Sequence, residues 1–434
     1  MENKFVSVSL KGYFIAVAVL MYYFLEETVN LGLFVTYRHV FALVLVFSTL
    51  FVFLLKPNIA RGAASLKSAL VYCTPLIVIV LVSLFIWFTK QVDTVVISRG
   101  LSAVFLYTNM FSFTFAAVAF LYVFGEKGIW YNLIAILISN FFIIFTVILQ
   151  NGIGPFISEF TTLVVSFAGE TGEVIVQAEV HELAFCLGAY LIYMLLKPKK
   201  NAAFWILFGL SLICFLISFK RIGIIAIVIA MVVGLLLKFI AQLNINTAKN
   251  LTVIISIIIV VLLIGYIAII KMDVFTLLEK AGIDTSGRVE IYDSVDRFYD
   301  FSLEFLGNGI GYLTYQLSSN ANIGVSAVHN DFLQYFIDLG FWGYILWLAS
   351  MTIVRVCYFG RKKRIDNAII TLALTVYLVI ASSTDNTMNY PLLTMVLAVI
   401  MIGHGFDDDV RDKEMQMFGY VSYDNNQAKE EAFL

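Results

Sequence analysis

The sequence predicts an all-α polytopic membrane protein, and three features support this fold class. Hydrophobic residues make up 61% of the 434 residues and charged residues 13%, a balance that excludes an ordinary soluble domain. Apolar runs of about 20 residues, the length that crosses a ~30 Å hydrocarbon core as a helix, follow one another from near Phe5 to near Gly405. The polar segments between most of these runs are short.

The apolar runs predict about twelve membrane-spanning helices. We expect residues 1–405 to form one transmembrane domain and the polar residues 406–434 to form a solvated cytoplasmic tail with the composition of a disordered segment. The predicted spans, whose ends carry an error of about two to four residues, are 5–26, 33–55, 68–89, 97–124, 128–149, 177–196, 202–219, 222–240, 251–271, 333–357, 367–383 and 391–405.

The distribution of basic residues predicts that both termini lie in the cytoplasm. With the N-terminus inside, 19 of the 28 lysines and arginines fall on the cytoplasmic side, and an even number of helices agrees with this orientation. Two long loops, 150–176 and 272–332, then face the extracytoplasmic side. The cytoplasmic set is Lys4, Lys11, Lys56, Arg61, Lys67, Lys127, Lys197, Lys199, Lys200, Lys238, Lys249, Arg355, Arg361, Lys362, Lys363, Arg364, Arg411, Lys413 and Lys429.

Several kinds of chemistry have no support in the sequence. Cys73, Cys186, Cys214 and Cys357 fall in predicted spans without paired spacing, so we expect buried free thiols rather than disulfides or a metal site. The chain has no Walker A loop, no G-x-G-x-x-G and no H-E-x-x-H motif. We therefore expect no metal, no cofactor and no nucleic-acid partner.

The 272–332 loop, between the ninth and tenth spans, contains the first candidate site residue. Its pattern predicts two short amphipathic helices, one over 274–280 and one from near 286 to about 305. On the second helix Arg288 shares a face with Tyr292 and other apolar residues. A guanidinium on such a face is costly unless it meets an anion, so Arg288 is a candidate ligand for a negatively charged group.

Arg297 lies on the other side of the same predicted helix. Asp293 precedes it by four residues and Asp300 follows it by three. This spacing predicts solvated ion pairs of about 0.3–0.5 kcal/mol each, and a substrate contact is the alternative interpretation.

The loop ends in the stretch "SAVHNDFLQYFIDLGFWGYIL", residues 326–346, which places His329 directly before the tenth span. At helical spacing His329 continues the apolar face formed by Phe332 and Phe336, at the outer mouth of the span. A histidine at the membrane interface is by itself ordinary. The upstream "GNGIG", residues 307–311, is a flexible turn and also a weak signal alone.

The order of these motifs is more informative than any one of them. S-G-R-x-x-x-Y from Ser286, G-x-G-x-G from Gly307 and H-N-D-x-L-Q-x-x-x-D-x-G-x-x-G from His329 resemble the O-antigen polymerase and ligase superfamily. These are bacterial membrane glycosyltransferases that act on undecaprenyl-pyrophosphate-linked sugars. The layout of about twelve helices, cytoplasmic termini and a large late outer loop is also similar to that family.

Two further stretches extend the resemblance. Ser218 to Arg221, "SFKR", is similar to the family's Ser-x-Arg or Ser-Arg pattern, and "HELAF" from His181 is similar to a degenerate His-Pro-Asn stretch. The sequence departs from the family in having Tyr292 where tryptophan is frequent and in lacking Pro-Asn after His181, which puts the role of His181 in doubt more than that of His329.

The resemblance implies a GT-C-like bundle in the bacterial inner membrane, with its active site on the extracytoplasmic face and no nucleotide or metal requirement. The residue types suit such chemistry. Arg221 and Arg288 would stabilise the pyrophosphate leaving group, because arginine stays charged and binds phosphate oxygens bidentately. His329 would accept the proton of the attacking sugar hydroxyl, since imidazole can do so at neutral pH.

Seven further residues are candidate substrate contacts, each with a structural alternative. For Arg38 the structural alternative is a side chain that snorkels to the membrane interface, and for Lys220 it is a side chain that caps a helix turn. Intramembrane or interfacial charges are nevertheless functional candidates by default. The candidate contacts are Arg38, Arg99, His181, Lys220, Tyr292, Arg297 and Asn330.

Three functions remain open at this stage. The favoured one is a polysaccharide polymerase for O-antigen, capsule or exopolysaccharide, which transfers a growing glycan from undecaprenyl pyrophosphate to a lipid-linked repeat unit. The second is a ligase that moves the glycan to another acceptor. The third is a flippase, disfavoured because the distinctive residues gather at one face and no paired broken helices are evident. Expected partners are the lipid-linked oligosaccharide and membrane lipid, and a chain-length regulator protein is a candidate.

Overall fold

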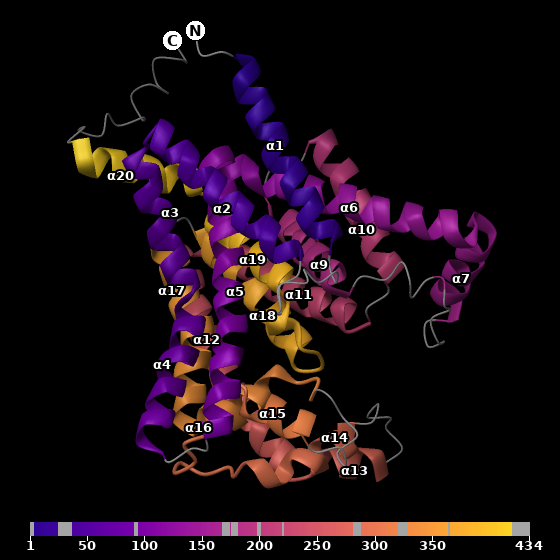
Figure 1. Cartoon of the computed structure of the whole chain (residues 1–434), viewed down its shortest axis with the longest axis vertical. Coiled ribbons are helices and arrows are strands. Elements are labelled where there is room, and N and C mark those ends of the chain that lie inside the picture. The colour runs from indigo at the N-terminus through magenta and orange to yellow at the C-terminus, as the bar shows by residue number, and fades with distance from the viewer. Residues whose placement is uncertain are drawn as a thin grey trace.

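The computed structural model describes residues 4–24, 37–90, 94–166, 174, 181–197, 201–218, 221–280, 288–319, 328–362 and 365–418, and every regular element in these ranges is helical (Figure 1). The α-helices are α1 (Lys4–Tyr23), α2 (Tyr37–Leu55), α3 (Ile59–Tyr72), α4 (Thr74–Thr89), α5 (Thr94–Phe124), α6 (Gly128–Asn151), α7 (Ile153–Ser166), α9 (His181–Leu196), α10 (Ala202–Ser218), α11 (Arg221–Leu243), α12 (Ile245–Lys271), α13 (Val274–Lys280), α14 (Arg288–Val295), α15 (Tyr312–Ser319), α16 (Asp331–Ala349), α17 (Arg355–Lys362), α18 (Ile365–Ser382), α19 (Pro391–Gly403) and α20 (Phe406–Phe418).

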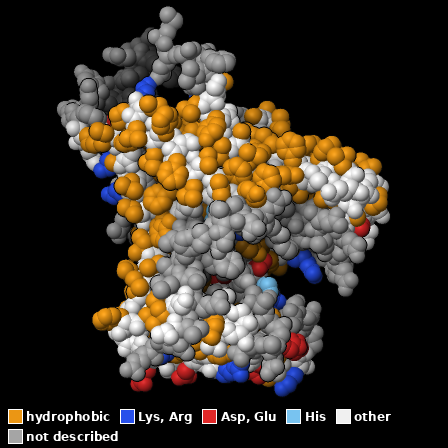
Figure 2. All heavy atoms as spheres, viewed as in Figure 1, with side chains coloured by type: hydrophobic (Ala, Val, Ile, Leu, Met, Phe, Trp, Pro, Cys, Tyr) orange, Lys and Arg blue, Asp and Glu red, His pale blue; other side chains and the backbone are white. Residues whose placement is uncertain are grey.

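The helices confirm an all-α polytopic membrane protein. Within the described ranges, six helices are long and apolar enough to cross a membrane, or eight if each of two bent pairs is one span. Three shorter helices, Val8–Tyr23, Glu182–Leu196 and Ala202–Ser218, are also apolar. Each of the twelve predicted spans overlaps a helix of the structure, while the count of twelve stays a prediction. Figure 2 shows apolar side chains covering the larger, upper part of the molecule, as a lipid-facing surface requires.

The molecule has two parts, a helical body and a loop lobe (Figure 1). The helical body contains α1–α7, α9–α12, α17–α20 and the later part of α16. Its centre is formed by α18 and α19, whose side chains are almost all buried. The loop lobe contains the described residues of 272–339. Figure 1 shows it at the opposite end of the molecule from the start of α1 and from α20, which agrees with the predicted placement of the long loop away from both ends of the transmembrane domain.

The helix α16 reverses direction at Gly340, so the predicted span 333–357 is wrong as a continuous helix. Gly340 has φ 71° and ψ −179°. The rings of Tyr335 and Trp347 lie 4.3 Å apart, whereas twelve residues of straight helix would separate them by about 18 Å. Residues 331–339 therefore form a short arm in the loop lobe, and the chain enters the helical body after Gly340.

The reversal is held by the Gly307–Gly311 turn. Asn308 and Gly309 donate their backbone N–H groups to the carbonyl oxygen of Asp338, at 3.1 and 2.7 Å. The buried Asp338 carboxylate accepts the N–H groups of Gly311 and Leu313, at 3.0 and 2.9 Å, and so caps the start of α15. The glycines of this motif thus have a structural purpose.

We expect Gly340→Ala to lower the free energy of unfolding by about 3 kcal/mol. A Cβ atom at this positive φ would overlap the backbone of Leu306 and Gly307. Gly154→Ala is the matched control, because a Cβ atom there meets nothing within 4 Å. The thermal unfolding midpoint of the purified protein would compare them, and equal midpoints for the two variants would argue against the close approach at Gly340.

Other expectations are corrected by local interactions. The predicted helix 274–280 is confirmed, but the second loop helix ends at Val295 and is followed by a 3-10 turn. The Lys271 ammonium binds the carbonyl oxygens of Asp296 and Tyr299, at 3.0 and 3.1 Å, and these carbonyls then lie outside the helical ladder. The start of the predicted tail is ordered as α20, because Phe406 and Val410 are buried.

Breaks within helices are also present, contrary to the expectation for the flippase alternative. The chain bends by 53° between α3 and α4, and by 54° between α19 and α20. Pro75 lies in the first turn of α4, and proline cannot continue a helical hydrogen-bond ladder. The absence of broken helices is therefore no longer an argument against transport.

Candidate functional site

The segment 383–390, which joins α18 to α19, lies where the loop lobe meets the helical body. It contacts the loop lobe through Arg288, His329 and Asp331, and the residue that follows Pro391 contacts Glu182 of α9. Figure 2 shows a hollow in the molecular surface between the body and the loop lobe. Residues from distant parts of the chain thus converge at this junction.

His329 is the most exposed member of this group. Its side chain is 55% exposed, and its Nδ1 atom lies 3.9 Å from Oδ1 of Asp385. This distance is longer than a hydrogen bond, as catalytic contacts often are before substrate binds. The Asp385 carboxylate also accepts the Tyr390 hydroxyl at 3.3 Å; burial, followed by the nearby Asp385 charge, raises the pKa of Tyr390, so that phenol keeps its proton.

The predicted location of His329 on the apolar face of a helix is wrong. His329 has φ 49° and precedes Asn330, the N-cap residue of α16. A non-glycine residue with positive φ is uncommon and costs about 1 kcal/mol or more, and such strain gathers at functional sites. The turn directs the imidazole to the surface instead of into the apolar core.

Two buried residues hold His329 in place. The side-chain Oδ1 atom of Asn330 accepts the N–H of Leu333 at 3.1 Å, and its side-chain Nδ2 atom donates to the hydroxyl groups of Tyr266 and Tyr292, at 3.1 and 2.9 Å. Asp331 accepts the N–H of Met388 at 2.8 Å and so ties α16 to the 383–390 segment. Asn330 and Tyr292 therefore fix the backbone next to His329 through their hydrogen bond. Direct contact of either residue with a glycan stays a prediction.

Arg288 reaches the same segment from the first residue of α14. Its Nη2 atom donates to the carbonyl oxygen of Thr384 at 3.1 Å, and Thr384 is adjacent to Asp385. The structure thus brings Arg288 and His329 to neighbouring residues of one segment, as required if the two act on one substrate.

On the side of the helical body, Arg38 forms an ion pair with Glu182. Nη1 of Arg38 lies 2.8 Å from Oε2 of Glu182, and Oε1 of Glu182 accepts the N–H of Leu392 at 2.6 Å. The predicted position of Arg38 at the end of a span is confirmed. Glu182, which belongs to the "HELAF" stretch, anchors the end of the 383–390 segment.

Arg221 lies at the same level of the helical body. α11 and α18 pack along each other, and Lys238 of α11 pairs with Asp366 of α18 at 3.9 Å. Arg221 is 17 residues before Lys238, and Ser383 is 17 residues after Asp366. Because the two helices are antiparallel, both positions lie about 25 Å from that pair, at the same end. Arg221 is exposed.

The remaining candidates are placed less closely or lie outside the description. The guanidinium of Arg297 lies 4.8 Å from the ring centroid of Phe298, and within the described residues it forms no ion pair with Asp293 or Asp300, because the helix ends before it. Lys220 lies outside the described residues. Arg99 and His181 lie in α5 and α9, but their side chains are outside the description.

Asp385 is not among the residues predicted from the sequence, which include Glu182 only as a neighbour of His181 in the "HELAF" stretch. Both are acidic residues next to predicted span ends, and the polar run "STDNTMNY" before Pro391 was a usable signal. Among the described residues, no group of three or more His, Cys, Asp and Glu side chains could hold a metal ion. The four cysteines are free, although Cys214 and Cys357 are partly exposed rather than buried.

A comparison with protein families bears on this geometry. Residues 202–348 match a family model described as O-antigen ligase. Over these residues the chain is similar to that family. The match covers about a third of the chain and includes Arg221, Arg288 and His329, whereas Arg38, Glu182 and Asp385 lie outside it. It is consistent with the O-antigen polymerase and ligase superfamily, and so with a ligase-type or polymerase-type glycosyltransferase. A search of curated proteins found no match.

Proposed function

We propose that the protein transfers a glycan from undecaprenyl pyrophosphate to a lipid-linked repeat unit, as a polysaccharide polymerase. The observation that carries this proposal is that Arg288 and His329 approach neighbouring residues of the 383–390 segment, Thr384 and Asp385. A pyrophosphate leaving group needs fixed positive charge, and an attacking sugar hydroxyl needs a proton acceptor. The junction supplies both within one site.

The arginines would hold the leaving group. Arg288 donates from Nη2 to the carbonyl oxygen of Thr384, and the planar fork of its guanidinium suits phosphate oxygens. Arg221 lies at the same end of the helical body and is exposed. As the glycosidic carbon–oxygen bond to pyrophosphate breaks, the negative charge that develops there would be stabilised by these guanidinium groups.

His329 would act on the acceptor. The exposed imidazole takes the proton of the sugar hydroxyl while its oxygen forms the new bond to the anomeric carbon. Asp385 orients the ring from its Nδ1 side and stabilises the imidazolium that results. Asp385 is therefore a positioning residue.

Two buried polar atoms support a ligand rich in hydroxyl groups. The Nε atom of Arg38 and the Oδ1 atom of Asn386 are buried and have no hydrogen-bond partner within the described residues. Such atoms usually find a partner, because leaving them unpaired costs about 1–3 kcal/mol each. A sugar hydroxyl both donates and accepts, so it could satisfy either.

A ligase is the second candidate, favoured by the description of the matching family. The donor chemistry of the two functions is the same, and the acceptor differs. To distinguish them, purified protein would receive one lipid-pyrophosphate-linked repeat unit without nucleotide or added metal, and products would be resolved by size. A ladder of longer glycans supports the polymerase. Product that forms after addition of a different acceptor, such as a lipid A core, supports the ligase, and no product with either contradicts both.

We expect Asp385→Asn to lower kcat about 10- to 100-fold, with a change of less than about threefold in KM for the lipid donor. Its carboxylate lies 3.9 Å from the His329 imidazole, and the arginines are proposed to hold the pyrophosphate. The substitution should therefore disturb the orientation of the base and keep donor binding. Steady-state rates over a range of donor concentrations would separate the two constants. A large rise in KM with unchanged kcat would assign Asp385 to donor binding instead.

A further inference from the structure

A second basic site lies inside the helical body, at Arg355. This residue was expected in the cytoplasmic set, but it is 6% exposed. Its Nε and Nη2 atoms both donate to the carbonyl oxygen of Tyr72, at 3.1 and 2.6 Å, and its guanidinium carbon lies 4.0 Å from the centroid of the Tyr72 ring. The buried cation is thus held by one neutral residue.

No carboxylate compensates this charge. Within the described residues Arg355 forms no ion pair, and its third nitrogen, Nη1, makes no hydrogen bond. An arginine inside a membrane domain normally pairs with an acid or a backbone carbonyl, or faces a polar cavity, because burying its charge alone costs several kcal/mol. The Tyr72 carbonyl supplies a dipole but no negative charge to balance the guanidinium. We therefore expect an anion to bind Arg355 and compensate its charge.

Irregular turns in two helices create the site. The break before Pro75 leaves the Tyr72 carbonyl at the end of α3, free to accept from Arg355. On the other side, residues Ser350–Val354 form a π-helical turn directly before Arg355. Such turns are rare and often occur at functional sites. The break before Pro75 and the π-helical turn thus lie on the two sides of the hydrogen bonds between Arg355 and Tyr72.

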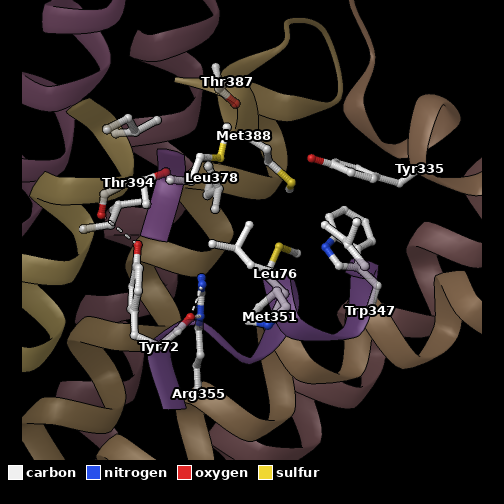
Figure 3. A pocket seen from close by; sticks show the side chains of 15 residues that line it. Tyr72, Leu76, Tyr335, Trp347, Met351, Arg355, Leu378, Thr387, Met388 and Thr394 are labelled. Carbon is white, nitrogen blue, oxygen red and sulfur yellow. Dashed lines mark hydrogen bonds between the residues drawn. The ribbon is translucent and has the colours of Figure 1, made fainter. Parts of the chain in front are cut away.

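Arg355 lines a cavity, shown in Figure 3. The cavity offers about 50 Å³ to the centres of water molecules, enough for roughly three or four waters or one group of similar size. Figure 3 shows Arg355 and Met351 on one side and Thr387 and Met388 on the other. The rest of the wall is largely apolar and includes Leu76, Ile79, Met110, Trp347, Leu393 and Leu397.

We propose that this cavity binds the phosphate group of a membrane lipid, with Arg355 as its counter-ion. A guanidinium matches phosphate oxygens in shape and charge, and the apolar wall suits the first carbons of a lipid chain. The cavity is too small for a disaccharide. Thr387 and Met388 line the cavity and belong to the 383–390 segment. A lipid bound here would therefore contact the segment that also carries Asp385.

Lipid binding at this cavity does not require glycan transfer and can be measured without it. Full-length protein would be purified in neutral detergent with Arg288→Ala in every sample, so that the proposed donor site does not contribute. A short-chain polyprenyl phosphate would be added, with the matching polyprenol and inorganic phosphate in parallel. The polyprenyl phosphate should raise the thermal unfolding midpoint by roughly 2–4 °C at saturation, and the alcohol should not.

Three substitutions locate the binding. Arg355→Met should abolish the shift, and so should Leu397→Phe, which narrows the cavity while keeping the charge. Lys280→Met, which removes an exposed basic residue of the loop lobe, should keep it. An undiminished shift in both cavity variants would overturn the site, and an equal shift with inorganic phosphate alone would overturn the assignment to a lipid.

Discussion

Replacing His329 with asparagine is expected to lower kcat for glycan transfer by roughly 10²- to 10⁴-fold. Asparagine tolerates the left-handed backbone of this position but cannot accept the proton. The side chain is 55% exposed, so the thermal unfolding midpoint should stay within about 1 °C of the wild type. Rate and stability should therefore separate in this variant.

His329→Gly extends the test. Glycine adopts φ 49° without strain, so this variant should be at least as stable as the wild type and equally inactive. Rates would be measured from the release of the lipid carrier, and stability from the unfolding midpoint. Activity retained in both variants would exclude His329 as the base, whatever the stability.

The second large effect is expected at Arg288. Arg288→Lys keeps the positive charge but loses the planar fork that can bind Thr384 and phosphate together. We expect kcat/KM for the lipid-pyrophosphate donor to fall by roughly 10²-fold. Steady-state kinetics with a single repeat unit as acceptor would measure this fall.

Lys280 provides the control for Arg288. It is an exposed basic residue in the same lobe, at the end of α13. Lys280→Ala should change kcat/KM by less than about twofold. Equal losses in the Arg288 and Lys280 variants would indicate that the lobe attracts the donor by its overall charge, and would contradict a specific phosphate contact.

The helices of this protein could be predicted from the sequence because burial in lipid requires long apolar segments. Every predicted span overlaps a helix, and the motif order places Arg288 and His329 in one lobe. The reversal of α16 could not be predicted, because hydropathy is continuous through Gly340 and one backbone angle decides the path. The location of His329 could not be predicted either, because its own backbone angle, φ 49°, keeps it out of the helix that begins at Asp331.

The partners of the predicted residues were harder to find. Asp385 meets His329 across 56 positions of sequence, and Glu182 meets Arg38 across 144. Such pairs depend on packing of α9, α18 and α19, which periodicity does not report. The sequence predicts Arg355 as a cytoplasmic charge, as a member of a basic cluster with Arg361 and Lys362, whereas the π-helical turn and the break at Pro75 bury it.

In the proposed mechanism the lipid pyrophosphate binds at the junction of the loop lobe and the helical body. The most direct measurement is a structure of the full-length protein with a non-transferable analogue of the undecaprenyl-pyrophosphate donor. We expect the phosphates within hydrogen-bond distance of Arg288, with the anomeric carbon on the side of His329. Pyrophosphate bound elsewhere, with Arg288 and His329 far from the donor, would contradict the proposed mechanism.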